Sequence, residues 1–325
     1  MRGHQRDDRC YNKKDKNMKV GIVGAGNVGS MLACRIVEEN MAEVVLLDII
    51  EGVAKGKAED INDSTSIKKT TKRVFGTSNY NHLKGSSLIV ITAGLVRQPG
   101  MTREELLKTN HATIKEVSKK ILYNCRNPII IMVTNPLDIM TYTFIKETGF
   151  SKKKVFGMAG TLDCGRLVNA ISTTLRALPS KINPAIIGPH NEDMIILERF
   201  TKVSGNPITS IIDKDRLAQI ARLTKERGAF IVSLLKKGSA YFAPSQAIFL
   251  MVKAIVTKSP KKIYASCYLD GEYGLRDVCI GVPAILGKNG IERIIELPLN
   301  KTEMDLLFNS ATKLKKIVDS LYPNV

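Results

Sequence analysis

Short apolar runs alternate with longer amphipathic segments along most of the chain. The runs have the length and β-branched composition of strands and cover residues 20–23, 44–47, 74–75, 88–92 and 129–133. They are apolar on both faces, as strands are when helices cover both sides of a parallel sheet. A helix is expected at 30–39, and a last short strand at 155–156 is expected to close this half. The pattern predicts βαβ units and an α/β fold with a Rossmann-type, doubly wound parallel sheet.

The pattern changes after Gly160. Helices are expected from near Asp163, over 216–237, after Pro244 and over 302–321, with strands at 186–187, 263–269 and 278–286. The turn Lys288-Asn289-Gly290 suits a hairpin. This half is predicted to be a mixed α+β catalytic domain over 159–325, joined tightly to a dinucleotide-binding domain over 18–158.

Residues 1–17 are polar and of mixed charge. They lack the apolar stretch of a secretory signal, and their three aspartates argue against a transit peptide. We expect this tail to lie outside the fold, either as a disordered tail or as a mis-assigned start, in which case translation begins at Met18.

Composition narrows the class of protein. The chain has 325 residues, 44% of them apolar, which is enough for a large core. Its six cysteines form no C-x-x-C pair, so neither a disulfide framework nor a metal site is expected, and the compartment is expected to be reducing. No apolar stretch is long enough to span a membrane. These features predict a cytoplasmic, metal-free protein.

The net charge of +18 raises the alternative of nucleic-acid binding. The lysines and arginines are spread in short runs, aromatic residues make up only 6% of the chain, and there is no tryptophan. Stacking platforms for bases are therefore scarce. We expect no nucleic-acid partner, and a basic surface that attracts a small anionic substrate.

A glycine-rich sequence follows the first predicted strand and precedes the first helix. It reads Gly24-Ala25-Gly26-Asn27-Val28-Gly29 and matches G-x-G-x-x-G, which brings backbone N–H groups and a helix N-terminus to a pyrophosphate. Asp48 ends the second strand about 20 residues further on, where a carboxylate binds a ribose 2′-hydroxyl. That carboxylate would repel a 2′-phosphate, so the sequence predicts NAD rather than NADP.

Three other polar segments follow predicted strands or begin helices. The loop from Ala93 and Gly94 carries Arg97 and Arg103, which could reach an anionic substrate at the carboxyl edge of the sheet. Asn135 follows the fifth strand, where its amide can contact a substrate oxygen. Asp163 and Arg166 stand three residues apart near a helix start, so they share one face.

Only four histidines are present: His4, His82, His111 and His190. His190 follows an apolar strand and sits in the loop-like stretch Gly188-Pro189-His190-Asn191-Glu192. If the protein uses an acid/base group of near-neutral pKa, His190 is the best candidate.

Together these features resemble the lactate/malate dehydrogenase family, most closely its bacterial, lactate-dehydrogenase-like malate dehydrogenases. The resemblance extends from Met18 to Leu321. It includes the segments Val133-Thr134-Asn135-Pro136-Leu137-Asp138, Gly157-Met158-Ala159-Gly160, Gly238-Ser239-Ala240-Tyr241-Phe242-Ala243-Pro244, Tyr268-Leu269-Asp270-Gly271-Glu272-Tyr273-Gly274 and Gly281-Val282-Pro283. The spacing of Gly24, Asp48, Arg97, Arg103, Asn135, Arg166 and His190 is also similar to that of the family.

The resemblance implies a role for each matched position. His190 would exchange the proton, with Asp163 orienting its ring, and Arg166 would hold the substrate carboxylate. Further substrate contacts would come from Arg97, Arg103 and Asn135. The NAD contacts implied are Gly24, Ala25, Gly26, Asn27, Val28, Gly29, Asp48, Ala93, Gly94, Asn110, Val133, Thr134 and Asn135.

The expected activity is NAD-dependent interconversion of (S)-malate and oxaloacetate. A lactate dehydrogenase is the alternative, separated from it by residue 97. The chain also departs from the family, with Asn191 and Glu192 where relatives usually have Gly-Asp, and Glu59 where they have leucine. The first departure leaves a weakly catalytic NAD-binding protein as a further alternative. The resemblance implies a homotetramer, with a dimer as the alternative.

Overall fold

The computed structural model describes residues 18–96, 100–236 and 238–323, so the tail 1–17 and Arg97 lie outside the described residues. Its first half contains six parallel strands and four helices. The strands are β1 (Lys19–Val23), β2 (Glu43–Leu47), β3 (Val74–Thr77), β4 (Leu88–Ile91), β5 (Ile129–Met132) and β6 (Val155–Met158). The helices are α1 (Asn27–Glu38), α2 (Val53–Ile67), α3 (Arg103–Asn124) and α4 (Leu137–Thr148).

The described part of the second half has four long helices and a group of antiparallel strands. The helices are α5 (Gly160–Leu175), α6 (Lys214–Leu235), α7 (Phe242–Val256) and α8 (Lys301–Leu321). The long strands are β12 (Lys261–Asp270), β13 (Arg276–Gly287) and β14 (Gly290–Ile294). Short strands lie between α5 and α6: β7 (Ile182–Asn183), β8 (Ile186–Ile187), β9 (Ile195–Ile196), β10 (Lys202–Val203) and β11 (Asn206–Pro207).

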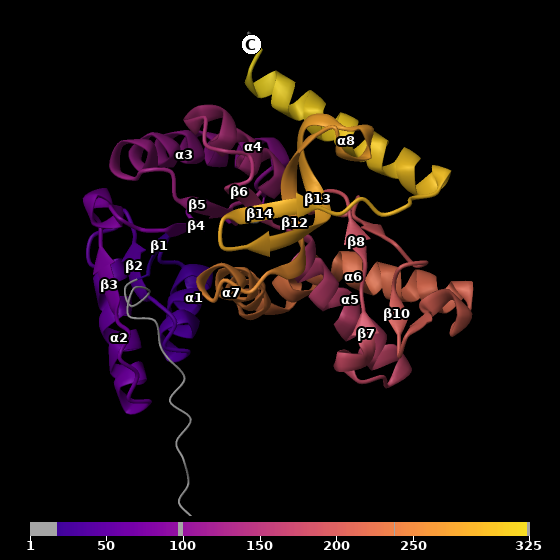
Figure 1. The fold of residues 1–325 in the computed structure, drawn as a ribbon, viewed down its shortest axis with the longest axis horizontal. Helices are drawn as coiled ribbons and strands as arrows, with labels where there is room; N and C mark the ends of the chain where they lie inside the picture. The colour runs from indigo at the N-terminus through magenta and orange to yellow at the C-terminus, as the bar shows by residue number, and fades with distance from the viewer. Residues whose placement is uncertain (1–17, 97–99, 237, 324–325) are drawn as a thin grey trace, which may run out of the picture.

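The parallel strands form a doubly wound sheet, which confirms the predicted fold class. Their order is β6-β5-β4-β1-β2-β3. Strands β4, β5 and β6 are buried along their whole length because helices cover both faces. Figure 1 shows α3 and α4 on one side of the sheet and α1 and α7 on the other.

The strand predicted at 155–156 is present as β6, the last parallel strand of the first half, but the sheet does not end there. β6 pairs in parallel with β5 and also, through Gly157 and Met158, with antiparallel β12. The sheet therefore continues through β13 and β14 to nine strands. Local sequence could not show this, because the pairing partner lies about a hundred residues further along the chain. The predicted hairpin at Lys288-Asn289-Gly290 is confirmed by the antiparallel pairing of β13 with β14.

The predicted helix boundaries shift by a few residues. α1 begins at Asn27, inside the glycine-rich sequence and directly after its second glycine, rather than at residue 30. α7 begins at Phe242, with Pro244 inside its first turn, where proline removes no helical hydrogen bond. The earlier start of α1 matters for the site, because it brings the helix N-terminus next to Gly26.

Candidate active site

The glycine turn between β1 and α1 forms an open cradle. Gly24 has a φ of +107°, a conformation that favours glycine. A Cβ on Gly29 would lie 2.0 Å from the carbonyl oxygen of Gly24, so this glycine lets the helix pack on the turn. A Cβ on Gly26 would have no atom within 4 Å, so the backbone there faces open space. Open space beside a helix N-terminus fits a pyrophosphate.

Asp48 lies against the same turn. Its carboxylate accepts hydrogen bonds from the backbone N–H groups of Ala25 at 2.8 Å and Ile50 at 3.1 Å. Lys57 of α2 donates to the carbonyl of Ala25 at 2.6 Å. Ile49 and Ile50 are 77% and 62% exposed beside the carboxylate. The carboxylate can accept hydrogen bonds from ribose hydroxyls, and the exposed isoleucine side chains can pack against an adenine ring. These residues therefore fit the adenosine half of NAD.

Asn110 joins the two loops that follow β4 and β5. Its side-chain oxygen accepts from the N–H of Leu95 at 2.8 Å, and its amide donates to the carbonyl of Asn135 at 2.7 Å. Gly94, with φ +146°, packs against Thr134 so closely that a Cβ would lie 2.5 Å from the Thr134 methyl group. The side chain of Asn110 is buried, whereas Asn135 is exposed at the carboxyl edge of the sheet.

Two neighbouring residues complete this junction. The Thr134 hydroxyl donates to the carbonyl of Ala93 at 2.6 Å. Ala93 and Val133 are partly buried against the core. These contacts hold both strand ends at the sheet edge where the nicotinamide half of NAD would lie.

His190 and Asp163 form a buried pair. The Nδ1 atom of His190 lies 2.7 Å from Oδ2 of Asp163, which sits in the first turn of α5. Because an ionised carboxylate only accepts, Nδ1 carries the hydrogen and Nε2 remains to exchange a proton. Burial alone would lower the pKa of the His190 imidazole, but the Asp163 carboxylate outweighs burial and raises it above its ordinary value.

Arg166 stands on the same face of α5. Its guanidinium lies 3.3 Å from Oδ1 of Asp163, which confirms the predicted i,i+3 arrangement. The side chain is only 16% exposed and packs on α6, where a Cβ on Gly228 would come within 3.3 Å of it. The planar guanidinium is thus held in a fixed place beside the His190–Asp163 pair, in a position that suits bidentate binding of a carboxylate.

Arg103 is the first residue of α3 and points to the loop that carries His190. Its guanidinium is 2.7 Å from a carboxylate oxygen of Glu192. Both side chains are exposed. The Glu192 backbone N–H and the Arg103 guanidinium both lower the pKa of the Glu192 carboxyl, so the ion pair is present at neutral pH.

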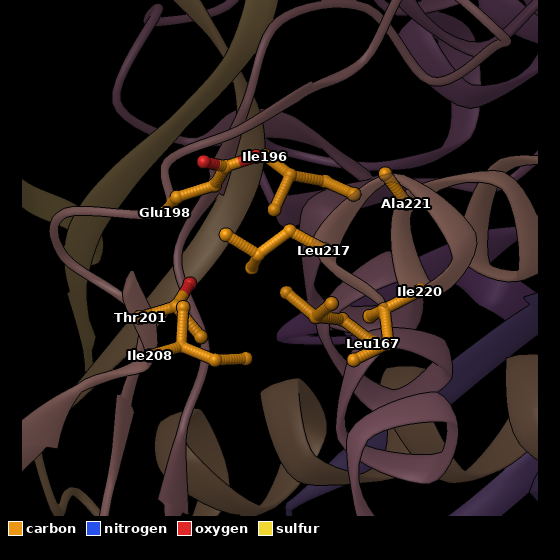
Figure 2. Close-up of a pocket in the computed structure, with 8 residues that line it drawn as sticks. All are labelled: Leu167, Ile196, Glu198, Thr201, Ile208, Leu217, Ile220 and Ala221. Carbon is orange, nitrogen blue, oxygen red and sulfur yellow. The ribbon is translucent and has the colours of Figure 1, made fainter. Parts of the chain in front are cut away.

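Two cavities lie near this loop. One, of about 620 Å³, runs from the loop that carries His190 to α6 and α8 and is bordered by Glu192, Asp193, Lys225, Lys313 and Lys316. The other, of about 10 Å³, is shown in Figure 2. Apolar side chains such as Leu167, Leu217 and Ile220 converge on the smaller cavity, which is too small for a substrate.

The sequence did not single out Asp138 or Ser266 for a role. Asp138, in the first turn of α4, accepts from the backbone N–H of His190 at 2.9 Å and from the Ser266 hydroxyl at 2.6 Å. An acidic residue at a helix start usually needs no explanation beyond the helix dipole. Nothing in the sequence therefore indicated a partner 52 residues away.

Within the described ranges, no helix is long and apolar enough to cross a membrane. The same part of the chain contains no group of three or more His, Cys, Asp or Glu side chains that could hold a metal ion.

The fold and the site have the features of a dinucleotide-dependent dehydrogenase, with an open glycine turn after β1 and a hydrogen-bonded His–Asp pair whose aspartate follows β6. Residues 18–157 match the lactate/malate dehydrogenase NAD binding domain, and residues 160–323 match the lactate/malate dehydrogenase alpha/beta C-terminal domain. The chain belongs to the lactate/malate dehydrogenase family.

Named relatives cover almost the whole chain. It is 42% identical to a malate dehydrogenase of Methanosarcina barkeri, over 93% of this chain and 99% of the relative. It is 43% identical to a malate dehydrogenase of Trichormus variabilis, over 93% of both chains.

Solved structures agree. The malate dehydrogenase of Cryptosporidium parvum superposes with a TM-score of 0.92 at 34% identity, covering 95% of this chain and all of that one. The lactate dehydrogenase of the same organism, solved with lactic acid and nicotinamide adenine dinucleotide, gives 0.91 at 33% identity over 95% and 99% of the two chains.

Proposed function

We propose that this protein is an NAD-dependent malate dehydrogenase that interconverts (S)-malate and oxaloacetate. The observation that carries the proposal is the His190–Asp163 pair with Arg166 beside it, at the edge of a sheet whose glycine turn is open. Curated relatives named malate dehydrogenase, at 41–43% identity over nearly the full length, support this substrate over lactate.

NAD supplies the hydride acceptor or donor when it is bound. The backbone at Gly26 and the start of α1 would hold its pyrophosphate, and Asp48 its adenosine ribose. Asn135 and the loop after β4 would border the nicotinamide. Thr134 and Asn110 would keep those two loops in register through the hydrogen bonds described above.

The substrate would bind between the two halves of the chain. Arg166 would take the carboxylate next to the reacting carbon, and Arg103 would polarise the carbonyl. His190 would give its Nε2 proton to the carbonyl oxygen of oxaloacetate, or remove a proton from the hydroxyl of malate. Asp163 stabilises the protonated imidazole, which suits the reduction direction at neutral pH.

The proposal also covers the organisation of the chain. We assign residues 18–158 to the cofactor and 159–325 to the substrate, supported by the two family matches. A homotetramer, or a dimer, and a cytoplasmic location complete the proposal.

The decisive experiment is turnover by the purified protein with NADH and either oxaloacetate or pyruvate. We expect fast oxidation of NADH with oxaloacetate, little with pyruvate, and little use of NADPH because of Asp48. Binding of NADH without turnover of either acid would instead favour a weakly catalytic NAD-binding protein.

Arg97 tests the choice of substrate. Oxaloacetate has a second carboxylate for this arginine to bind, whereas pyruvate has a methyl group there. Leaving a buried charge unpaired costs roughly 3–5 kcal/mol, or about two to four powers of ten in kcat/KM. Arg97→Gln should therefore lower kcat/KM for oxaloacetate and raise it for pyruvate. If the variant kept the original preference for oxaloacetate over pyruvate, Arg97 would not be the residue that selects the substrate.

A further inference from the structure

Apart from the side-chain contacts described above, the backbone of the loop that carries His190 is hydrogen-bonded to other described elements at two points. Just before the loop, Gly188 exchanges backbone hydrogen bonds with Gly281 of β13, at 2.8 and 3.0 Å. At His190 itself, the backbone N–H donates to Oδ2 of Asp138 at 2.9 Å. The second point is the only one of the two made by a side chain.

Asp138 stands out because its carboxylate is buried and each of its oxygens accepts a hydrogen bond. Burial raises the pKa of this carboxyl, while the hydrogen bonds from Ser266 and from the His190 backbone oppose that rise. The residue is 5% exposed, and its second oxygen accepts from the Ser266 hydroxyl of β12 at 2.6 Å. Burying a carboxylate costs free energy of folding unless the group is well hydrogen-bonded. Here the donors come from β12 and from the loop that carries His190. Asp138 also lies three residues after Asn135, on the first turn of the helix that follows the proposed nicotinamide loop.

We propose that Asp138 is a positioning residue for the acid/base group: it holds the His190 backbone in place and adds a negative charge beside the imidazole. Its buried carboxylate is directed to His190 and Ser266, so it would act through His190 rather than on the substrate or NAD. This inference rests on the proposed function for its kinetic consequences, but the arrangement can also be tested without a substrate.

The charged groups around the imidazole are few. Asp163 and Arg166 face it from α5 and Asp138 from α4, while Arg227 of α6 stands behind Arg166. Both carboxylates raise the pKa of His190, and Arg166 lowers it. Removing the charge of Asp138 while keeping a hydrogen-bond acceptor should therefore lower the His190 pKa.

The kinetic test compares three variants of the full chain. Asp138→Ala removes both acceptors and should lower kcat about 10- to 100-fold, since a displacement of about 1 Å can cost as much. Asp138→Asn keeps one acceptor and should recover part of that loss. Thr141→Val, a buried substitution one turn further along α4, should keep the kcat of the unmodified enzyme. The dissociation constant for NADH should stay unchanged in all three.

The second test needs no turnover. Proton NMR of the ligand-free chain follows the imidazole of His190, identified by the signal lost in His190→Asn. Asp138→Asn should move its titration to lower pH, and Thr141→Val should not. Unmodified kcat in Asp138→Ala, or an unchanged His190 titration in Asp138→Asn, overturns the inference. Failure of the unmodified enzyme to use oxaloacetate would instead overturn the proposed function, and the titration would still decide the role of Asp138.

Discussion

At the scale of single residues, the site is a network of hydrogen bonds centred on His190. One carboxylate oxygen of Asp163 accepts a hydrogen bond from the His190 imidazole and the other accepts one from Arg166. The Asp138 carboxylate accepts a hydrogen bond from the backbone N–H of the same histidine. The histidine therefore has a fixed tautomer and a fixed place before any substrate binds. Such preorganisation is what general acid–base catalysis requires.

Replacing His190 should abolish proton transfer without releasing the cofactor. We expect His190→Asn to lower kcat by about 10²- to 10⁴-fold. The dissociation constant for NADH, measured by fluorescence titration, should change little because the glycine turn and Asp48 belong to the other half of the chain. Equal activity of the variant would show that another group donates the proton.

The raised pKa of His190 also predicts opposite pH profiles for the two directions. Oxaloacetate reduction needs the protonated imidazole, so its kcat/KM should fall as pH rises through that pKa. Malate oxidation needs the neutral form and should rise over the same interval. Both limbs should be absent from the residual activity of His190→Asn.

Glu192 should compete with the substrate for Arg103. An exposed ion pair contributes about 0.2–1 kcal/mol, which corresponds to a factor of about 1.4–5 in affinity. Glu192→Gln should therefore lower KM for oxaloacetate by up to about 5-fold at low ionic strength, and added salt should shrink the difference.

Asp193→Asn is the matched control for that change. It removes the same charge from the next residue of the loop, but its partner is Lys313 of α8 at 2.9 Å rather than Arg103. An equal fall in KM for both variants would mean that the total negative charge near the site sets the KM for oxaloacetate, and that the Glu192–Arg103 ion pair has no specific effect.

At the scale of elements, Gly26 and Gly29 at the start of α1 have different structural roles. Gly26→Ala should leave the melting temperature unchanged, because a Cβ there meets nothing within 4 Å, but should weaken NADH binding by blocking the pyrophosphate. Gly29→Ala should destabilise the protein by roughly 1–3 kcal/mol, because its Cβ would collide with the carbonyl of Gly24.

Thermal unfolding and NADH titration of the two variants separate these effects. Equal losses of stability would show that the open space at Gly26 is filled by the protein in solution, and that the cradle is not a binding surface.

The elements themselves were largely predictable from the sequence. Buried parallel strands are apolar throughout, so residues 88–91 and 129–132 stood out without any tertiary information. The candidate site was predictable where residues follow strands or share a helix turn, as Asp163 and Arg166 do. The Glu192–Arg103 and Asp138–His190 contacts were not, because they join side chains and loops that come together only in the folded chain.

At the scale of the whole molecule, the continuous sheet makes the two halves structurally dependent on each other. β6 belongs to the parallel strands and pairs directly with β12 of the second half. On the sheet face opposite α3 and α4, α7 of the second half packs on α1 (Figure 1), and Arg35 of α1 donates to the Ser245 hydroxyl of α7 at 3.2 Å. Separating the halves would expose the buried edge of β6 and the apolar face of α7, so neither half should be stable alone.

We therefore expect one cooperative unfolding transition. The chain contains no tryptophan, so a single engineered tryptophan reports on one half only. Phe75→Trp in β3 and Phe308→Trp in α8 replace partly exposed aromatic side chains, at 53% and 40% exposure, and should not disturb the core. Their thermal midpoints should coincide.

Oxidised NAD extends the same test. At a concentration about 100 times its dissociation constant, a ligand of the native state adds about 2.7 kcal/mol of stability. Because NAD is proposed to bind the first half, a cooperative molecule should show the same rise in midpoint at both tryptophans. A rise at Phe75→Trp alone would mean that the sheet does not couple the halves, and that the second half unfolds independently of the cofactor.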